Sequence, residues 1–343
     1  MHFRAQKFIA CVVPLALAAG IATAQQPKPV PSTSIVGDAK EVRESVSLIG
    51  LPKELVVSGD TLYDSYFAGA ETIRFKSGAR LIFSDKALNV RKNFIVAAKT
   101  IVNEDQAKPG VITWARGNGP AASPPASGQA PGGPHGQSDG SSGGPGSNGA
   151  QGNPGIGGAD APNLTLFMVS ASGAPPVIDL RGQAAGAGGA GQRGGDGGVG
   201  HKGSPASSSL FDCKSGAGYG GNGGPGGNGG QGGRGGTGGK GGTVTLVSLP
   251  TAFPALLQLV RSDVSGGDGG EGGPGGAGGS GGPGGEQGAK SEPYCKDEPG
   301  RRGANGPAGQ PGGKGDKGGV GIQGDVMYTT LTQDAFNGIF GAK

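Results

Sequence analysis

The side chains that could do chemistry are few in this chain. Cys213 and Cys295 are the cysteines that remain once an N-terminal export signal is removed, and His135 and His201 are the remaining histidines. Two thiols in an oxidising compartment most simply form one disulfide. A histidine-based nucleophile or metal cluster would need more histidines close together. We therefore expect a cystine, but no catalytic residue, metal or cofactor.

Carboxylates are more numerous, and a pair of them could hydrolyse a glycosidic bond. In the segment 42–116 they include Asp60, Asp64, Asp85, Glu104 and Asp105. Turn capping and solvated charge is the simpler interpretation of these acids. Matches to G-x-S-x-G and G-x-G-x-x-G occur within glycine runs, without the strand and helix that these motifs need around them. A non-catalytic protein is therefore predicted. The alternative is a carbohydrate-active enzyme whose chemistry takes place on the β-strands of the segment 42–116.

The dominant pattern is glycine at a period of three residues. The chain holds 80 glycines in 343 residues, and the segment 220–242 reads as Gly-Gly-X triplets. A period of three is that of the left-handed extended helix with three residues per turn. All X side chains then share one stripe, and two stripes of bare backbone are left to approach other chains closely. Several such segments can pack together through backbone hydrogen bonds.

Three outward and three return arms are predicted within residues 117–324. The starting residues are Gly117, Gly182 and Gly266 for the outward arms, and Asn163, Thr243 and Asp325 for the strands that follow the return arms. These three strands start 80 and 82 residues apart. The two arms of each pair nearly match in length, as a hairpin requires if both of its feet stand on one base. At ~3.1 Å per residue the arms would be roughly 60–85 Å long.

The base that carries the arms is predicted to be all-β. Short β-branched segments in residues 42–116 are separated by Gly, Ser and Asp, and no helix-length period is present. Residues 71–85 (ETIRFKSGARLIFSD) resemble the rungs of right-handed parallel β-helices, and a β-sandwich is the alternative. Strand-like segments between the arms, Val177–Leu180 and Leu257–Val260 among them, complete the base. The predicted fold class is an all-β base carrying about six polyglycine-II helices, with essentially no α-helix.

The N-terminus reads as a secretory signal peptide. Arg4 and Lys7 precede an apolar run, and Ala22-Thr23-Ala24 offers a cleavage site. No later apolar stretch is long enough for a transmembrane anchor. The formal charge of +4 falls to +2 without the signal, which gives no reason to expect nucleic acid as a partner. The predicted segments are 1–24 (signal peptide), 25–41 (flexible leader), 42–116 (β base), 117–324 (three hairpins with interleaved strands) and 325–343 (final strand and tail).

Collagen is the obvious alternative for glycine triplets, and residues 300–324 alone would pass as collagen. Elsewhere the second triplet position is mostly Gly, whereas a triple helix needs imino acids there. The Gly-Gly-X runs resemble the polyglycine-II bundles of the springtail antifreeze protein and of certain phage tail-fibre adhesins, over residues 117–324. The resemblance implies glycine helices stacked in two or more layers. Because of its glycine triplets, we also expect a sequence search to classify the chain as collagen-like.

The tips of the second and third hairpins are the candidate binding site. Aromatic and charged groups at the far end of a rigid support suit recognition of a cell surface or glycan. The candidate residues are Leu210, Phe211, Asp212, Tyr294, Lys296, Asp297 and Glu298. For Phe211 and Tyr294, covering a disulfide is the alternative role. Outward arms of near-equal length bring Cys213 and Cys295 to the same height, so we predict that they are bonded to each other.

The function predicted from these features is adhesion or surface binding by a secreted, non-catalytic, monomeric protein, in the periplasm or outside the cell. Ice binding is a second alternative. It would need an ordered array of small apolar or Thr side chains, and charged residues such as Arg193, Asp196 and Arg234 interrupt any such array.

Overall fold

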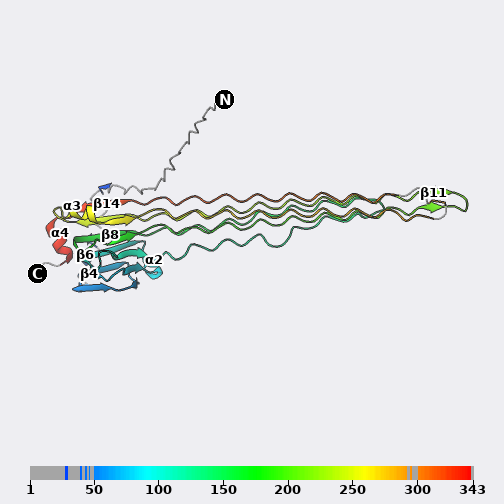
Figure 1. Ribbon diagram of the computed structural model, residues 1–343. Helices are drawn as coiled ribbons and strands as arrows, with labels where there is room; N and C mark the ends of the chain where they lie inside the picture. Colours follow the sequence, from blue (N-terminus) through cyan, green and yellow to red (C-terminus); the bar gives the residue numbers. More distant parts are fainter. Residues whose placement is uncertain are drawn as a thin grey trace, which may run out of the picture.

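The protein has a strand-built base at one end and a long bundle of glycine-rich arms that extends from it (Figure 1). The computed structural model describes residues 28–29, 39–40, 43–44, 46, 50–291, 294–295 and 300–340. The predicted signal peptide lies outside the described residues. Two residues of the predicted leader, Lys28 and Pro29, form strand β1 and pair with Met327 and Tyr328.

The base consists of two parallel sheets between which the chain alternates. The larger sheet has the order β1-β14-β12-β8-β6-β4-β2 and the smaller one β13-β9-β7-β5-β3. The larger sheet comprises β1 (Lys28–Pro29), β2 (Glu54–Val57), β4 (Phe67–Phe75), β6 (Asn93–Asn103), β8 (Asn163–Ser172), β12 (Val244–Ser248) and β14 (Val326–Thr330). The smaller sheet comprises β3 (Asp60–Tyr63), β5 (Arg80–Phe83), β7 (Val111–Trp114), β9 (Val177–Asp179) and β13 (Arg261–Asp263).

This strand order is that of a parallel β-helix, and the alternative of a β-sandwich is wrong. Each turn of the coil adds one strand to each sheet, so β2 pairs with β4 while β3 pairs with β5, both in parallel. The corners hold the turn signals seen in the sequence. Gly59, between β2 and β3, and Gly78, between β4 and β5, both have positive φ, a conformation that favours glycine. The all-β class is therefore confirmed.

Alternating side chains of the larger sheet serve two hydrophobic cores. In β6, Phe94 and Val96 lie in the core between the sheets, while Ile95 and Ala97 lie in a second cluster on the opposite face. The ring of Phe94 stacks on Phe83 of β5 with the centroids 4.1 Å apart. Because successive strand residues point to opposite faces, burial of both sets means that this sheet is covered on both sides.

Short helices are formed by α2 (Asp85–Val90), α3 (Phe253–Leu259) and α4 (Gln333–Phe340), and residues 39–40, 43–44 and 46 are helical as well. Leu257–Val260 was predicted as a strand, and this is wrong, because α3 occupies that segment and β13 begins at Arg261. A proline in the first turn favours the helix start. In the predicted C-terminal tail, α4 buries Phe336, Ile339 and Phe340 on one face and covers the second core cluster.

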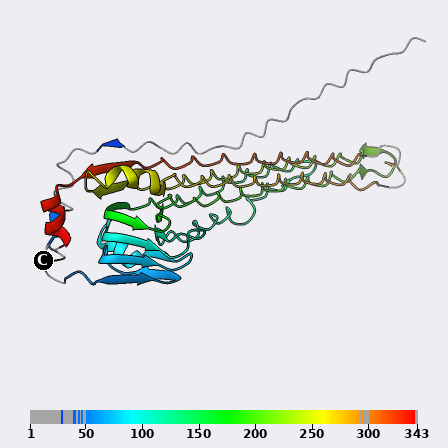
Figure 2. The same cartoon turned by 60° about the vertical axis from the view of Figure 1, so that its left-hand side comes forward.

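The three hairpins leave the base where the chain passes from the smaller sheet back to the larger one (Figure 2). We name the six segments by direction. The outward arms are residues 117–136, 182–206 and 264–289, and the return arms are residues 140–162, 216–243 and 300–325. The outward arms follow β7, β9 and β13, and the return arms lead into β8, β12 and β14.

Backbone hydrogen bonds at every third residue join the arms in two layers. Within the layer of return arms, Gly149 N–H donates to the carbonyl of Asn228 and Gly229 N–H to that of Gln310, both at 2.8 Å. Outward arms form the other layer in the same way. Between the layers, Gly230 N–H donates to the carbonyl of Gln192 at 2.8 Å. The two N–H groups of each Gly-Gly pair therefore bond to different neighbouring arms. Backbone hydrogen bonds, and not buried apolar side chains, are the main contacts that hold the arms together.

Bare backbone is required where an arm has neighbours on two sides. A Cβ atom on Gly229 would overlap the carbonyl oxygen of Gly276, and one on Gly230 would overlap that of Ala150. The X residue just before this glycine pair, Asn228, is exposed. The last return arm lies at an edge, and a Cβ on its Gly313 would meet no atom within 4 Å. Residues 300–324 therefore need only one glycine per triplet, which explains why this stretch alone looks like collagen.

Candidate binding surface at the bundle tip

A disulfide joins the outer ends of the second and third hairpins. Cys213 and Cys295 are bonded, with their Cα atoms 5.0 Å apart and 82 residues between them in the sequence, as predicted. The first hairpin turns back nearer the base, because Gly140 N–H already donates to the carbonyl of Lys202. The far end of the bundle is thus made by the second and third hairpins, within the described residues.

A tight turn presents two apolar side chains at this end. Strands β10 (Ser207–Ser208) and β11 (Cys213–Ser215) pair in antiparallel fashion around it. Ser209 N–H donates to the carbonyl of Asp212 at 2.8 Å, and the Ser209 hydroxyl accepts from Asp212 N–H at 3.1 Å. These bonds hold Leu210 and Phe211 at the apex, where the side chains are 81% and 86% exposed. The structure therefore places two large apolar groups in solvent on an ordered turn.

The remaining tip candidates lie in different situations. Asp212 is exposed, and Tyr294 is 46% exposed beside the buried Cys295. Phe211 does not cover the disulfide, because it is almost fully exposed. Lys296, Asp297 and Glu298 lie outside the described residues. The structure thus brings Leu210, Phe211, Asp212 and Tyr294 to one end of the molecule and describes no position for the other three.

The carboxylates of the base have structural partners. Asp64 accepts from the Ser84 hydroxyl at 2.6 Å and from Lys86 at 2.9 Å, and these hydrogen bonds lower its pKa. Asp105 accepts from the Ser77 hydroxyl and from backbone N–H groups, which lower its pKa as well. Glu104 pairs with Lys76 at 2.7 Å. A lowered pKa keeps a carboxyl ionised near neutral pH and makes it a poor general acid.

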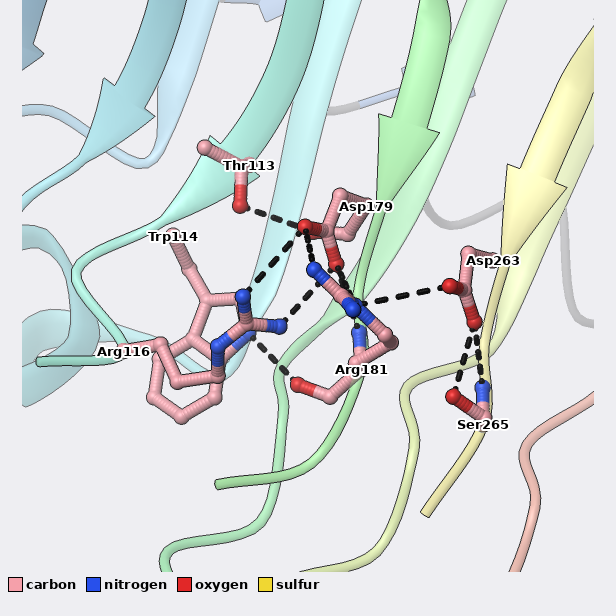
Figure 3. A network of polar contacts seen from close by, with 7 residues as sticks. All are labelled: Thr113, Trp114, Arg116, Asp179, Arg181, Asp263 and Ser265. Atoms are coloured by element: carbon pink, nitrogen blue, oxygen red, sulfur yellow. Dashed lines mark hydrogen bonds and ion pairs between the residues drawn. The ribbon is translucent and has the colours of Figure 1, made fainter. Parts of the chain in front are cut away.

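A partly buried ionic network lies where the outward arms leave the base (Figure 3). Asp179 pairs with Arg116 at 3.0 Å and with Arg181 at 2.8 Å, and Arg181 also reaches Asp263 at 3.4 Å. Burial raises the pKa of Asp179, but the hydrogen bonds from Arg181 and Arg116 outweigh burial and lower it. The indole N–H of Trp114 donates to the carbonyl of Arg181 at 3.1 Å. The network ties together the starting points of all three outward arms.

A cavity of about 720 Å³ opens beside this network. Trp114 and Arg116 line it together with Asp85, Lys92 and Asp160. Its charges are of both signs, and Arg116 is already engaged by Asp179. Trp114 is buried, with its N–H used by the chain itself, so it offers no open platform to a sugar. The cavity is a cleft between the base and the arms.

Sequence reasoning missed Tyr219, an exposed aromatic residue close to the tip. Its side chain is 66% exposed. It occupies the X position immediately before the run that starts at Gly220, and Gly220 N–H donates to Arg301 as the later triplets donate to their neighbours. The signal was present in the sequence, because extending the triplet count by one step places Tyr219 on the stripe that carries Asn222 and Asn228.

Comparisons with known proteins give little to identify the chain. No protein-family model and no curated protein matches it, so nothing supports the expected classification as collagen-like. Among solved structures, it is similar to the springtail antifreeze protein from Granisotoma rainieri, a bundle of nine polyproline type II helices. The identity is 28%, over 53% of this chain and 92% of that chain, with a TM-score of 0.09. A score this low carries no argument about the fold. In the described residues no helix has the length and apolar character needed to cross a membrane.

Proposed function

We propose that this chain is a secreted, non-catalytic scaffold whose glycine arms form a polyglycine-II bundle and whose tip binds a cell surface or glycan. Four features support the proposal: the period of three in the hydrogen bonds, the exclusion of Cβ atoms at both glycines of a triplet, the disulfide, and the N-terminal export signal. A scaffold of this kind holds its tip far from its base, at a distance set by backbone hydrogen bonds.

The observation that carries the binding role is the exposure of Leu210 and Phe211. Large apolar side chains held in solvent on an ordered turn are unfavourable for an isolated protein, and they commonly mark contact sites. The turn is linked to the third hairpin by the disulfide and by a hydrogen bond between the Ser208 and Ser291 hydroxyls at 3.0 Å. An ordered turn loses little conformational entropy when it binds, which favours affinity.

The proposal is tested by binding of the labelled, exported protein to a glycan array and to whole cells. The test variant replaces Leu210 and Phe211 by Ser. The matched control replaces Val320 and Ile322 by Ser, because these two apolar residues are also exposed but lie on an arm. We expect binding to fall at least tenfold in the tip variant alone. Equal binding by the two variants, or no binding of the wild type to any glycan or cell, would contradict the proposal.

A further inference from the structure

One face of the bundle carries an ordered, uncharged array of side chains near the tip. We call it the distal return face. It consists of the X positions of the three return arms over four successive triplets, and all of them are exposed. In rows across the arms, starting nearest the tip, they are Ser142, Asn222 and Ala304; Pro145, Pro225 and Pro307; Asn148, Asn228 and Gln310; and Gln151, Gln231 and Gly313.

The Asn side chains of this face are fixed in orientation. Asn148 Oδ1 accepts from Asn228 N–H at 2.9 Å, and Asn228 Oδ1 accepts from Gln310 N–H at 2.8 Å. Asn222 Oδ1 accepts from Ala304 N–H at 2.9 Å in the same way. With each oxygen engaged, the amide nitrogen retains its two donors, and none of these three nitrogens bonds to another residue in the described part of the chain. The face therefore presents hydrogen-bond donors that are already oriented.

Apolar surface alternates with these amides. The row of three prolines lies between the two rows that contain Asn, and consecutive rows are ~9.3 Å apart at three residues per turn. Tyr219 extends the central stripe by one step toward the tip and is exposed, and the exposed Arg301 lies beside it in that row. Nearer the base the same stripes carry charge, at Arg234, Lys240 and Asp316. The uncharged array is thus limited to four rows, with charged residues on the same stripes at both ends.

We propose that the distal return face binds an uncharged, hydroxyl-bearing polysaccharide with flat sugar rings. The prolines and Tyr219 would contact the apolar faces of the rings, and the Asn donors would bond to sugar oxygens. The array has no charge to attract a polyanion, and its fixed amides lose little entropy on binding. This inference goes beyond the proposed function, because it concerns the side of the bundle and not its tip.

The test is co-sedimentation of the exported full chain with microcrystalline chitin and with cellulose. The face variant combines Tyr219→Ala, Asn222→Ala and Asn228→Ala. The control removes one exposed apolar residue and two asparagines of the arms that lie away from the face, as Val320→Ala, Asn153→Ala and Asn305→Ala. We expect the wild type and the control to sediment with at least one polysaccharide, and the face variant to bind at least tenfold more weakly. If circular dichroism shows that the face variant is unfolded, Tyr219→Ala alone serves in its place.

Three outcomes would overturn the inference. The first is that the wild type sediments with neither polysaccharide. The second is equal binding by the face variant and the wild type, or an equal loss of binding in the control. The third is inhibition of ice growth by the distal return face without binding to either polysaccharide. If the tip variant bound cells and glycans as well as the wild type did, while polysaccharide binding by the distal return face was observed, only the proposed function would be contradicted.

Discussion

Asn148 and Asn228 lie on neighbouring return arms, and the backbone N–H of Asn228 donates to Asn148 Oδ1 at 2.9 Å. The two residues are 80 positions apart, and the same offset relates Leu164 to Val244 in the base. Val244 pairs in turn with Val326, an offset of 82, which also separates Asn228 from Gln310. The parallel register of the sheet therefore continues unchanged into the glycine arms.

This register makes the Asn side chains part of the bundle. We expect Asn228→Ala to lower the free energy of unfolding by about 1 kcal/mol, because Gln310 N–H loses its acceptor. The neighbouring X-position change Gln231→Ala serves as the control and should stay within about 0.5 kcal/mol of the wild type. Chemical denaturation of both variants measures the difference. Equal stability of the two would show that the Asn hydrogen bonds contribute nothing.

Glycine is required at inner positions of the bundle and not at its edge. Gly230→Ala should destabilise the protein by at least about 3 kcal/mol, since the methyl group would overlap the carbonyl of Ala150. Gly313→Ala is the matched control. The added methyl group meets open space, so the substitution should be neutral. It could also stabilise the protein by up to about 1 kcal/mol, because alanine lowers the conformational entropy of the unfolded chain. Thermal melts of the two variants measure the difference in stability. Equal melting temperatures for Gly230→Ala and Gly313→Ala would contradict tight packing of the arms.

The disulfide should matter most at the tip. Replacing both Cys213 and Cys295 by Ser removes a closure of 82 residues, worth roughly 4–5 kcal/mol on the chain-entropy model. We expect hydrogen exchange to rise first in residues 204–215, with the first hairpin and the base less affected. Peptide mapping of the exported protein without reduction should recover one intramolecular bond. Free thiols or a bond between chains would argue against the hairpin arrangement.

Acid should weaken the foot of the bundle through Asp179. Its pKa is lowered in the folded protein because the hydrogen bonds from Arg181 and Arg116 outweigh burial. A lowered folded-state pKa contributes stability above the unfolded value of about 3.9, and this contribution is lost as the pH falls through the folded value. Asp179→Asn should therefore cost about 1–3 kcal/mol at neutral pH and lose less stability below pH 4 than the wild type. Asp212→Asn, at an exposed position, serves as the control in pH-dependent melts.

Much of the local structure could be read directly from the residues. Short apolar segments such as Arg80–Phe83 predicted strands correctly. The spacing of 80 and 82 residues between the strands after the return arms equals the register offsets of β8, β12 and β14, although their pairing was not predicted. The prediction for Leu257–Val260 was wrong because a short apolar run suits either a strand or a buried helix. The C-terminal helix α4 was missed, although Phe336, Ile339 and Phe340 have helical spacing.

The sequence by itself determined the period of three, the equal arms and the cysteine pair, because each follows from residue type and spacing along the chain. Only the tertiary structure decided which glycines are indispensable, since the backbone of Ala150, 80 residues away, forbids a side chain at Gly230, whereas Gly313 lies beside open space. It also decided that the Asn and Pro residues of three arms form common rows. Such rows depend on the register between segments distant in sequence, and this register is set by pairing of the strands in the base.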